Sequence, residues 1–169
     1  NSDDYFTGSD NYHYFNNERL NPYIRDEGTD FRWVRTDVLG GRSLVWGRKC
    51  FRWSEIDFEA NKKDGHGIDW PIRYADIAPW YSRVEDFIGV SGEKLALEQL
   101  PDGEFLPPMD LSIAERHFKS AVADSFDGRV VTIGRTANLT KPKPEHGRGQ
   151  CMYRNQCIRG CAFGAYFST

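Results

Sequence analysis

Three cysteines lie within eleven residues in the pattern C-x5-C-x3-C, formed by Cys151, Cys157 and Cys161. Thiols so close in sequence can converge on one point if the chain wraps around it, and Gly160 gives the backbone the freedom to do so. An iron–sulfur cluster is bound by thiolates, and a cluster with three irons needs only three of them. Backbone amides and Arg154 or Arg159 nearby would stabilise the negative charge of such a cluster.

Other chemistry is open to the same cysteines. Zinc normally takes a fourth ligand, for which His146 or Cys50 are the nearest candidates. Disulfide pairing would leave at least one of the three without a partner inside the triplet, with only Cys50 elsewhere. A small metal-binding or disulfide-stapled interaction domain, or three structural thiols, are therefore alternatives to a cluster.

A second candidate site is the glycine run, residues 39–47, with the sequence LGGRSLVWG. Gly40 and Gly41 allow the backbone to approach a flat or phosphorylated ligand closely, and positive φ angles there can point successive N–H groups at an anion. Ser43 adds a hydroxyl donor. The alternative is an ordinary glycine turn in which Trp46 is a core anchor.

The composition indicates a globular chain, with 39% hydrophobic and 28% charged residues among its 169. The formal net charge of −3, without a long basic run, argues against a nucleic-acid partner. No stretch of about 18 consecutive apolar residues occurs, so we expect no transmembrane segment in this piece. The chain has no initiator methionine, and we expect it to be an internal part of a larger protein whose compartment the sequence leaves open.

Two helices are predicted. The first starts near Tyr74, with Asp76 as its cap and Pro79 in its first turn, and it stops at Gly89. The second starts at the capping box of Ser112 and Glu115, continues with an apolar stripe and ends at 127–128. Residues 93–110, which contain Pro101, Gly103, Pro107 and Pro108, connect the two.

Strands are expected at residues 12–15 and 31–38, the latter leading into the glycine run, and at residues 129–139, which begin with alternating β-branched side chains. The remaining sequence is typical of long loops. We therefore expect an α+β piece with few strands, two helices and long loops.

Five segments are informative when taken in their order along the chain: GGRSLVWG (40–47), DFEANKKDGHGIDWPIRYADIAPWY (57–81), VEDFIGVSG (84–92), QLPDGEFLPP (99–108) and CMYRNQCIRGCAFGAYFS (151–168). Together they resemble the glucose-methanol-choline (GMC) family of FAD-dependent oxidoreductases, in its bacterial branch of sugar and gluconate dehydrogenases. The resemblance runs through most of the chain.

The resemblance implies that Gly40, Gly41, Ser43 and Trp46 contact FAD along its flavin or pyrophosphate. Some relatives attach the flavin covalently through a histidine at the position of Val45, so FAD should be bound non-covalently here. Family members with the same cysteine spacing hold a three-iron cluster. Cys151, Cys157 and Cys161 would thus pass electrons from reduced flavin to a cytochrome or another acceptor subunit, as in a dehydrogenase.

The resemblance also implies that this chain is a single internal fragment of a two-domain enzyme and that its segments have different roles. Residues 31–92 would contact the flavin, 93–150 would form a helix–strand part of the substrate or cap region, and 151–169 would carry the cysteine motif. The glycine fingerprint for the ADP part of FAD would precede residue 1, and the catalytic histidine would follow Thr169. We therefore expect no catalytic residue in this chain, and in the intact protein the oxidation of a hydroxyl, possibly at C3, of a sugar or glucoside.

Overall fold

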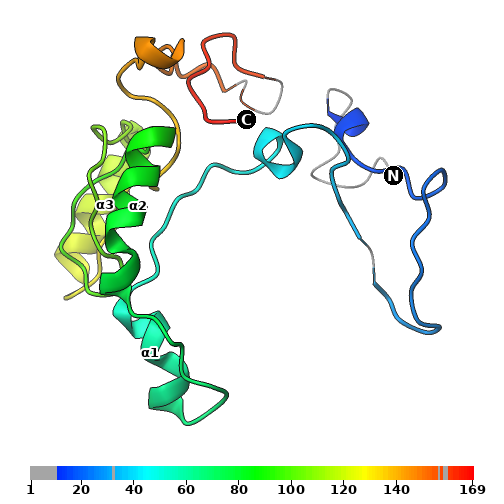
Figure 1. Cartoon of the computed structure of the whole chain (residues 1–169). Helices are drawn as coiled ribbons and strands as arrows, with labels where there is room; N and C mark the ends of the chain where they lie inside the picture. The colour runs from blue at the N-terminus through cyan, green and yellow to red at the C-terminus, as the bar shows by residue number, and fades with distance from the viewer. Residues whose placement is uncertain (1–10, 32, 156, 158–159) are drawn as a thin grey trace. The chain divides into compact units, whose positions relative to one another are not determined.

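Helices supply the regular structure of the residues that the computed structural model describes, which are 11–31, 33–155, 157 and 160–169 (Figure 1). Within these ranges, extended segments meet only at isolated bridges and no longer strand is formed. In chain order, the helices are η1 (Tyr12–Tyr14), η2 (Gly41–Leu44), α1 (Glu55–Asp64), α2 (Tyr74–Ile88), α3 (Ile113–Ser125) and η3 (Pro144–His146), where η denotes a 3₁₀ helix.

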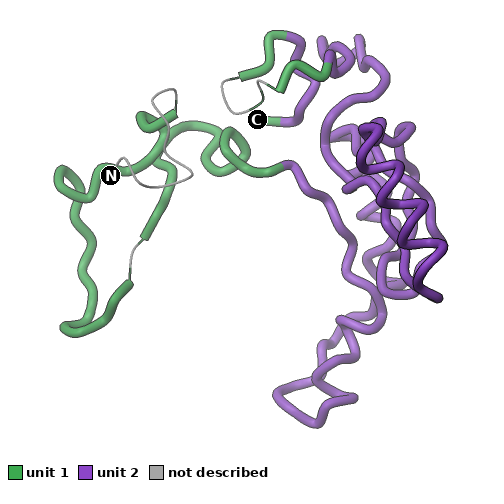
Figure 2. Tube along the Cα trace, turned by 180° about the vertical axis from the view of Figure 1, so that it is seen from behind, with its two compact units in different colours: residues 1–47, 153–162, 168–169 green, residues 48–152, 163–167 purple. Residues whose placement is uncertain are grey.

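The chain divides into two compact units (Figure 2). Unit 1 comprises the described residues of 1–47, 153–162 and 168–169, and it includes the glycine run. Unit 2 comprises residues 48–152 and 163–167, and it includes the three α-helices. The boundary after residue 47 falls inside the predicted flavin-contacting segment, and the one after residue 152 falls inside the predicted cysteine motif.

Helix α2 begins at Tyr74, as the sequence predicts, but its cap differs from the expected one. Asp76 accepts a hydrogen bond from the backbone N–H of Arg73 at 2.8 Å, so it is the third residue of a capping box and not the cap itself. Pro79 consequently lies inside the helix, not in its first turn. Gly89 ends α2 with a φ of 76°, the left-handed conformation that glycine adopts without steric cost.

Helix α3 starts where the sequence predicts, because the Ser112 hydroxyl accepts from the N–H of Glu115 and the Glu115 carboxylate accepts from the N–H of Ser112. Helix α1 was not expected. It has a capping box of Ser54 and Asp57 and a glycine stop at Gly65, yet Phe58 is its one buried residue within the described chain. An element so poor in apolar periodicity gives little helical signal in sequence.

The predicted strands are only partly realised. Residues 12–14 form η1, and Phe15 then makes an antiparallel bridge with Thr36 in the second predicted strand. In the third, pairing is confined to bridges of Thr136 and Asn138. The described residues thus contain three α-helices instead of two and isolated bridges instead of strands, and the α+β class stays a prediction.

Unit 2 is organised around the central run, residues 135–139. Its backbone bonds residues 48–50, through Ala137 N–H to Arg48 O at 2.9 Å, and Thr136 bonds Ser91 in both directions at 2.9 and 3.0 Å. Leu139 N–H donates to Ala165 O at 2.8 Å. The side chains of Ala137 and Leu139 are fully buried, so the run is both a hydrogen-bonding centre and part of the core.

A buried ion pair ties the segment before α1 to α2. The Arg52 guanidinium donates to both carboxylate oxygens of Glu85, at 2.9 and 2.5 Å, and their side chains are only 3% and 6% exposed. Arg52 also donates to Tyr74 and Ser82, both at 2.9 Å. Removing one partner of such a pair leaves a buried charge without compensation, which typically costs about 3–5 kcal/mol.

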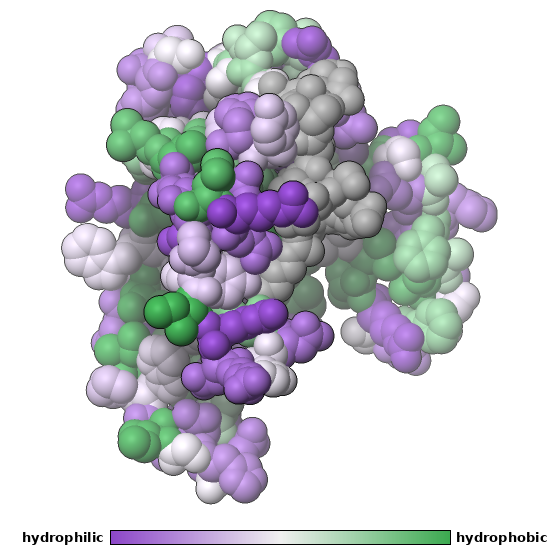
Figure 3. All heavy atoms as spheres, turned by 90° about the vertical axis from the view of Figure 1, so that its right-hand side faces the viewer, coloured by the Kyte–Doolittle hydropathy of each residue, from purple (hydrophilic) through white to green (hydrophobic). Residues whose placement is uncertain are grey.

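Apolar side chains also reach the surface, where they lie among polar ones on the face shown in Figure 3. On α2 they include Trp80, Val84 and Phe87, each more than half exposed. In the described part of the chain, every helix is too short or too polar to cross a membrane.

The packing at the end of α2 predicts that two glycine substitutions differ in their effect on the free energy of unfolding. A Cβ atom on residue 89 would overlap the Leu139 side chain, whereas one on Gly65, the corresponding position after α1, would meet nothing within 4 Å. Because both glycines have positive φ, Gly65→Ala should cost about 1–2 kcal/mol of unfolding free energy. Gly89→Ala should cost about 2–4 kcal/mol, since overpacking is added.

Urea unfolding of the two variants measures the difference, provided that the slope of free energy against denaturant is unchanged. Equal losses for Gly65→Ala and Gly89→Ala would show that Leu139 does not pack against this turn.

Candidate cofactor-binding site

The glycine run turns sharply because both of its leading glycines adopt left-handed conformations. Gly40 has a φ of 92° and Gly41 a φ of 51°, which confirms the positive angles expected of them. The Gly41 N–H donates to Val38 O at 2.9 Å, and η2 follows directly. A Cβ atom on residue 40 would lie 3.0 Å from Thr169 O, a tight contact, and the positive φ independently favours glycine there.

Ser43 uses its hydroxyl within unit 1. It donates to Gly40 O at 2.8 Å, accepts from the Thr169 N–H at 3.0 Å and lies 2.6 Å from the Thr169 hydroxyl. A hydroxyl has one donor and two acceptor positions, so these contacts fill it. In this arrangement Ser43 fastens the turn, and contact with a flavin would require exchange of one of these bonds.

Trp46 is half-buried and follows η2. Val45 caps the end of this helix, because its N–H donates to Arg42 O at 3.1 Å. The four predicted flavin contacts, Gly40, Gly41, Ser43 and Trp46, thus lie within one turn and its exit. Their role toward FAD stays a prediction.

None of the four cysteines forms a disulfide, and each is partly exposed. Cys151 belongs to unit 2, whereas Cys157 and Cys161 belong to unit 1. Within the described ranges, no three side chains of His, Cys, Asp or Glu gather in a group that could hold a metal ion. The donor set is nevertheless of the right chemistry for iron and sulfide, because none of these thiols is consumed in a disulfide. The cluster ligands stay a prediction.

The backbone between the cysteines departs from ordinary conformations. Tyr153 and Asn155 each have a φ of 51°, and Gly160 has a φ of 92°. The Gly160 N–H donates to Cys157 O at 3.3 Å. Of the two arginines expected to balance the charge of a cluster, Arg154 is exposed and Arg159 lies outside the described residues.

The alternative zinc ligands have other surroundings. His146 packs its ring edge-on against Phe87, with the ring centres 5.8 Å apart. The Cys50 thiol donates to Arg48 O at 3.4 Å, and burial raises its pKa to about 11. Both features give these residues roles in the packing of unit 2.

Three positions that sequence reasoning missed hold the predicted site residues in place. Thr169 bonds Ser43 in unit 1. In unit 2, Leu139 bonds Cys151 and Ala165, and Arg148 bonds Gly164 and Ala165. No local pattern marks them, because each acts on residues distant in sequence. Unit 1 also has a cavity of about 290 Å³, but no predicted site residue lines it; its walls are Glu18, Pro22, Tyr23, Arg25, Asp30 and Phe31.

Sequence comparison relates the chain to oxidoreductases. It is 25% identical over 164 residues to the fructose dehydrogenase large subunit of Gluconobacter japonicus, an alignment that covers 88% of this chain and 28% of that protein. It is 36% identical over 70 residues to the 6'''-hydroxyparomomycin C oxidase of Streptomyces lividus, covering 40% of this chain and 12% of the oxidase. A third relative is the 2-methyl-1,2-propanediol dehydrogenase of Mycolicibacterium austroafricanum, 29% identical over 91 residues, or 51% of this chain and 16% of the relative.

Each relative is named as a dehydrogenase or an oxidase, which agrees with the oxidoreductase class expected from sequence. No family model matches the chain. The chain spans little more than a quarter of the fructose dehydrogenase large subunit and smaller shares of the other two.

The environment of Cys50 predicts its reactivity. A pKa of about 11 leaves Cys50 protonated at neutral pH, and the thiolate is the nucleophile, so its alkylation by iodoacetamide should be on the order of 100-fold slower than that of an ordinary cysteine. Because the thiolate population grows with pH up to the pKa, the rate should keep rising to about pH 11. Peptide mapping by mass spectrometry measures it, with protein unfolded in urea as the control. A native rate equal to the unfolded rate would contradict the burial of this thiol.

Proposed function

We propose that the protein containing this chain is an FAD-dependent dehydrogenase of the GMC family that oxidises a hydroxyl group of a sugar or glucoside. The main support for this proposal is the alignment with the fructose dehydrogenase large subunit across 88% of the chain. The sugar and aminoglycoside names of the relatives support a carbohydrate substrate, for which we propose oxidation at the C3 hydroxyl.

In this proposal the glycine run binds the cofactor through its shape. The left-handed Gly40 and Gly41 carry no side chain, which lets a flat or phosphorylated group approach the backbone, and Ser43 keeps the turn closed through Thr169. Trp46 lies directly after the turn. Bound FAD would supply the hydride acceptor, with the proton of the hydroxyl passing to a histidine outside this chain.

Electrons would leave through a three-iron cluster held by Cys151, Cys157 and Cys161. The support is the number and spacing of the thiols and the fact that none of them forms a disulfide. A cluster implies an acceptor, and we propose a cytochrome or other electron-accepting subunit as the partner. The words "large subunit" in the name of the Gluconobacter relative favour such an assembly.

A second candidate keeps the flavin chemistry without a cluster, so that electrons pass to dioxygen. It is favoured by the relative from Streptomyces lividus, which is named an oxidase. The two candidates differ in iron content and in the acceptor that they use.

Substitution of one cysteine separates them. Cys157→Ser in the full protein should abolish the iron content and electron transfer to an artificial dye, while the visible absorption bands of oxidised flavin remain. Cys50→Ser is the matched control, because Cys50 is a free thiol outside the triplet and should leave iron, flavin and dye-linked activity unchanged. Elemental analysis and absorption spectra give the readout.

Wild-type protein with flavin but without iron would reject the cluster and favour the oxidase. Wild-type protein with zinc alone and no flavin would reject both candidates, in favour of a small metal-binding domain.

A further inference from the structure

The cysteine motif lies between two backbone arms that unit 2 holds together. The first arm is residues 149–151 and the second is residues 163–167. Gly149 N–H donates to Phe163 O at 2.7 Å, which joins the arms directly. Leu139 joins them again from the central run, because its carbonyl accepts from Cys151 N–H and its own N–H donates to Ala165 O, both at 2.8 Å.

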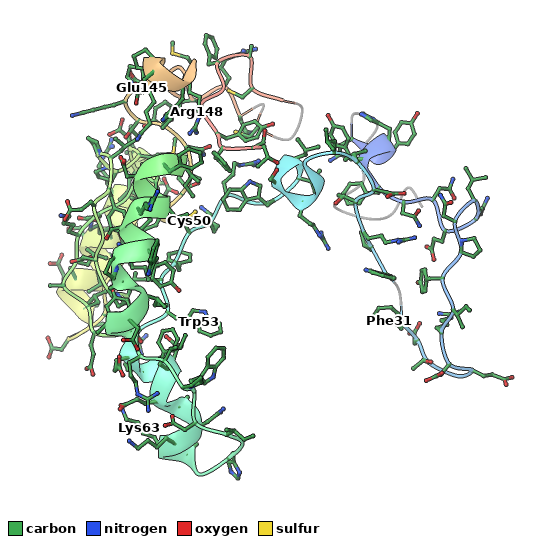
Figure 4. The ribbon with its side chains drawn as sticks, in the orientation of Figure 1. Phe31, Cys50, Trp53, Lys63, Glu145 and Arg148 are labelled. Atoms are coloured by element: carbon green, nitrogen blue, oxygen red, sulfur yellow. The ribbon has the colours of Figure 1, made fainter. Side chains whose placement is uncertain are left out.

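One side chain reinforces this junction. Arg148 directly precedes the first arm and is labelled in Figure 4, after η3. Its Nε donates to Gly164 O at 3.0 Å and its Nη2 to Ala165 O at 3.3 Å, so a single guanidinium bonds two successive carbonyls of the second arm. The guanidinium also lies over the Phe167 ring, 5.5 Å from its centre.

The remaining contact of Arg148 anchors the junction to a helix. Nη1 donates to Ile88 O at 2.8 Å, the carbonyl of the last residue of α2. The last carbonyls of a helix lack partners within it and carry partial negative charge, so a cation there is favoured. Burial lowers the pKa of Arg148, and the partners recorded for its donors are neutral backbone carbonyls instead of a carboxylate.

We propose that Arg148 is a positioning residue for the cluster, an inference that rests on the proposed function. By fixing the second arm to the first and both to the end of α2, Arg148 sets the separation at which the chain leaves Cys151 and returns after Cys161. Metal ligands depend on such surrounding contacts for their orientation. Arginine suits the task because its planar fork directs donors to several acceptors at once, whereas lysine is a point charge on a flexible stem.

The test compares arginine variants in the full protein by their iron content per flavin and by the electron paramagnetic resonance signal of the cluster. Arg148→Lys keeps the charge but not the fork, and Arg148→Met removes both. Loss of contacts that orient metal ligands typically weakens metal binding by about 10–100-fold. Iron per flavin after treatment with a chelator should therefore fall from wild type to Arg148→Lys and further to Arg148→Met, with a broadened resonance signal in Arg148→Lys.

Arg135 supplies matched controls, because it is another arginine of unit 2 that bonds the backbone. It donates to Pro101 O at 2.5 Å and to Asp102 at 2.7 Å, away from the two arms. Arg135→Lys and Arg135→Met should lower thermal stability without lowering iron per flavin. Iron and resonance signals in Arg148→Lys that match those of Arg135→Lys would overturn the positioning role. If Arg148→Met yields no folded protein, the comparison of Arg148→Lys with Arg135→Lys alone tests the positioning role.

Wild-type protein that contains no iron would instead reject the proposed cluster itself, so the two failures are distinguishable.

Discussion

The hydrogen bonds of the central run are the constraint on which unit 2 depends. Residues 135–139 present backbone groups to the segment that follows the glycine run, to the exit of α2 at Ser91 and to both arms of the cysteine motif. Ala137 and Leu139 are fully buried, and a backbone N–H or carbonyl left without a partner there would cost about 1–3 kcal/mol. Each neighbouring segment is therefore held in register, although none of them is a formal strand.

Arginine side chains supply hydrogen bonds that the backbone of a sheet would otherwise make. Arg135 lies at the start of the central run with its side chain 2% exposed, bonded to Asp102 and to carbonyls of the connector before α3. Arg52 binds Glu85, and Arg148 binds the end of α2. Loops without regular pairing leave many carbonyls to satisfy, and a guanidinium with five donors can serve several of them together. The long connectors of this chain are thus compatible with a defined position for each motif.

Sequence reasoning succeeded where the signal is local. The capping box of Ser112 and Glu115 fixes the start of α3, and Gly89 fixes the end of α2, because both depend on residues within one turn. It failed where partners are distant. Alternating side chains at residues 129–139 suggested a strand, but formation of a strand depends on neighbours that the sequence does not reveal, and only bridges form. The same holds for the site. The positive φ angles of Gly40 and Gly41 could be predicted from their sequence. The contacts of Ser43 with Thr169 and of Arg148 with Gly164 could not, because no local pattern connects these residues.

The conformation of the cysteine motif links its geometry to its chemistry. Among the described residues, four other than glycine have a positive φ, and two of them, Tyr153 and Asn155, lie between Cys151 and Cys157. Each such residue costs on the order of 1–3 kcal/mol and persists only where surrounding interactions over-determine it. Metal binding can contribute its free energy to folding. In the proposed enzyme, binding of the cluster would therefore offset the backbone strain at Tyr153 and Asn155.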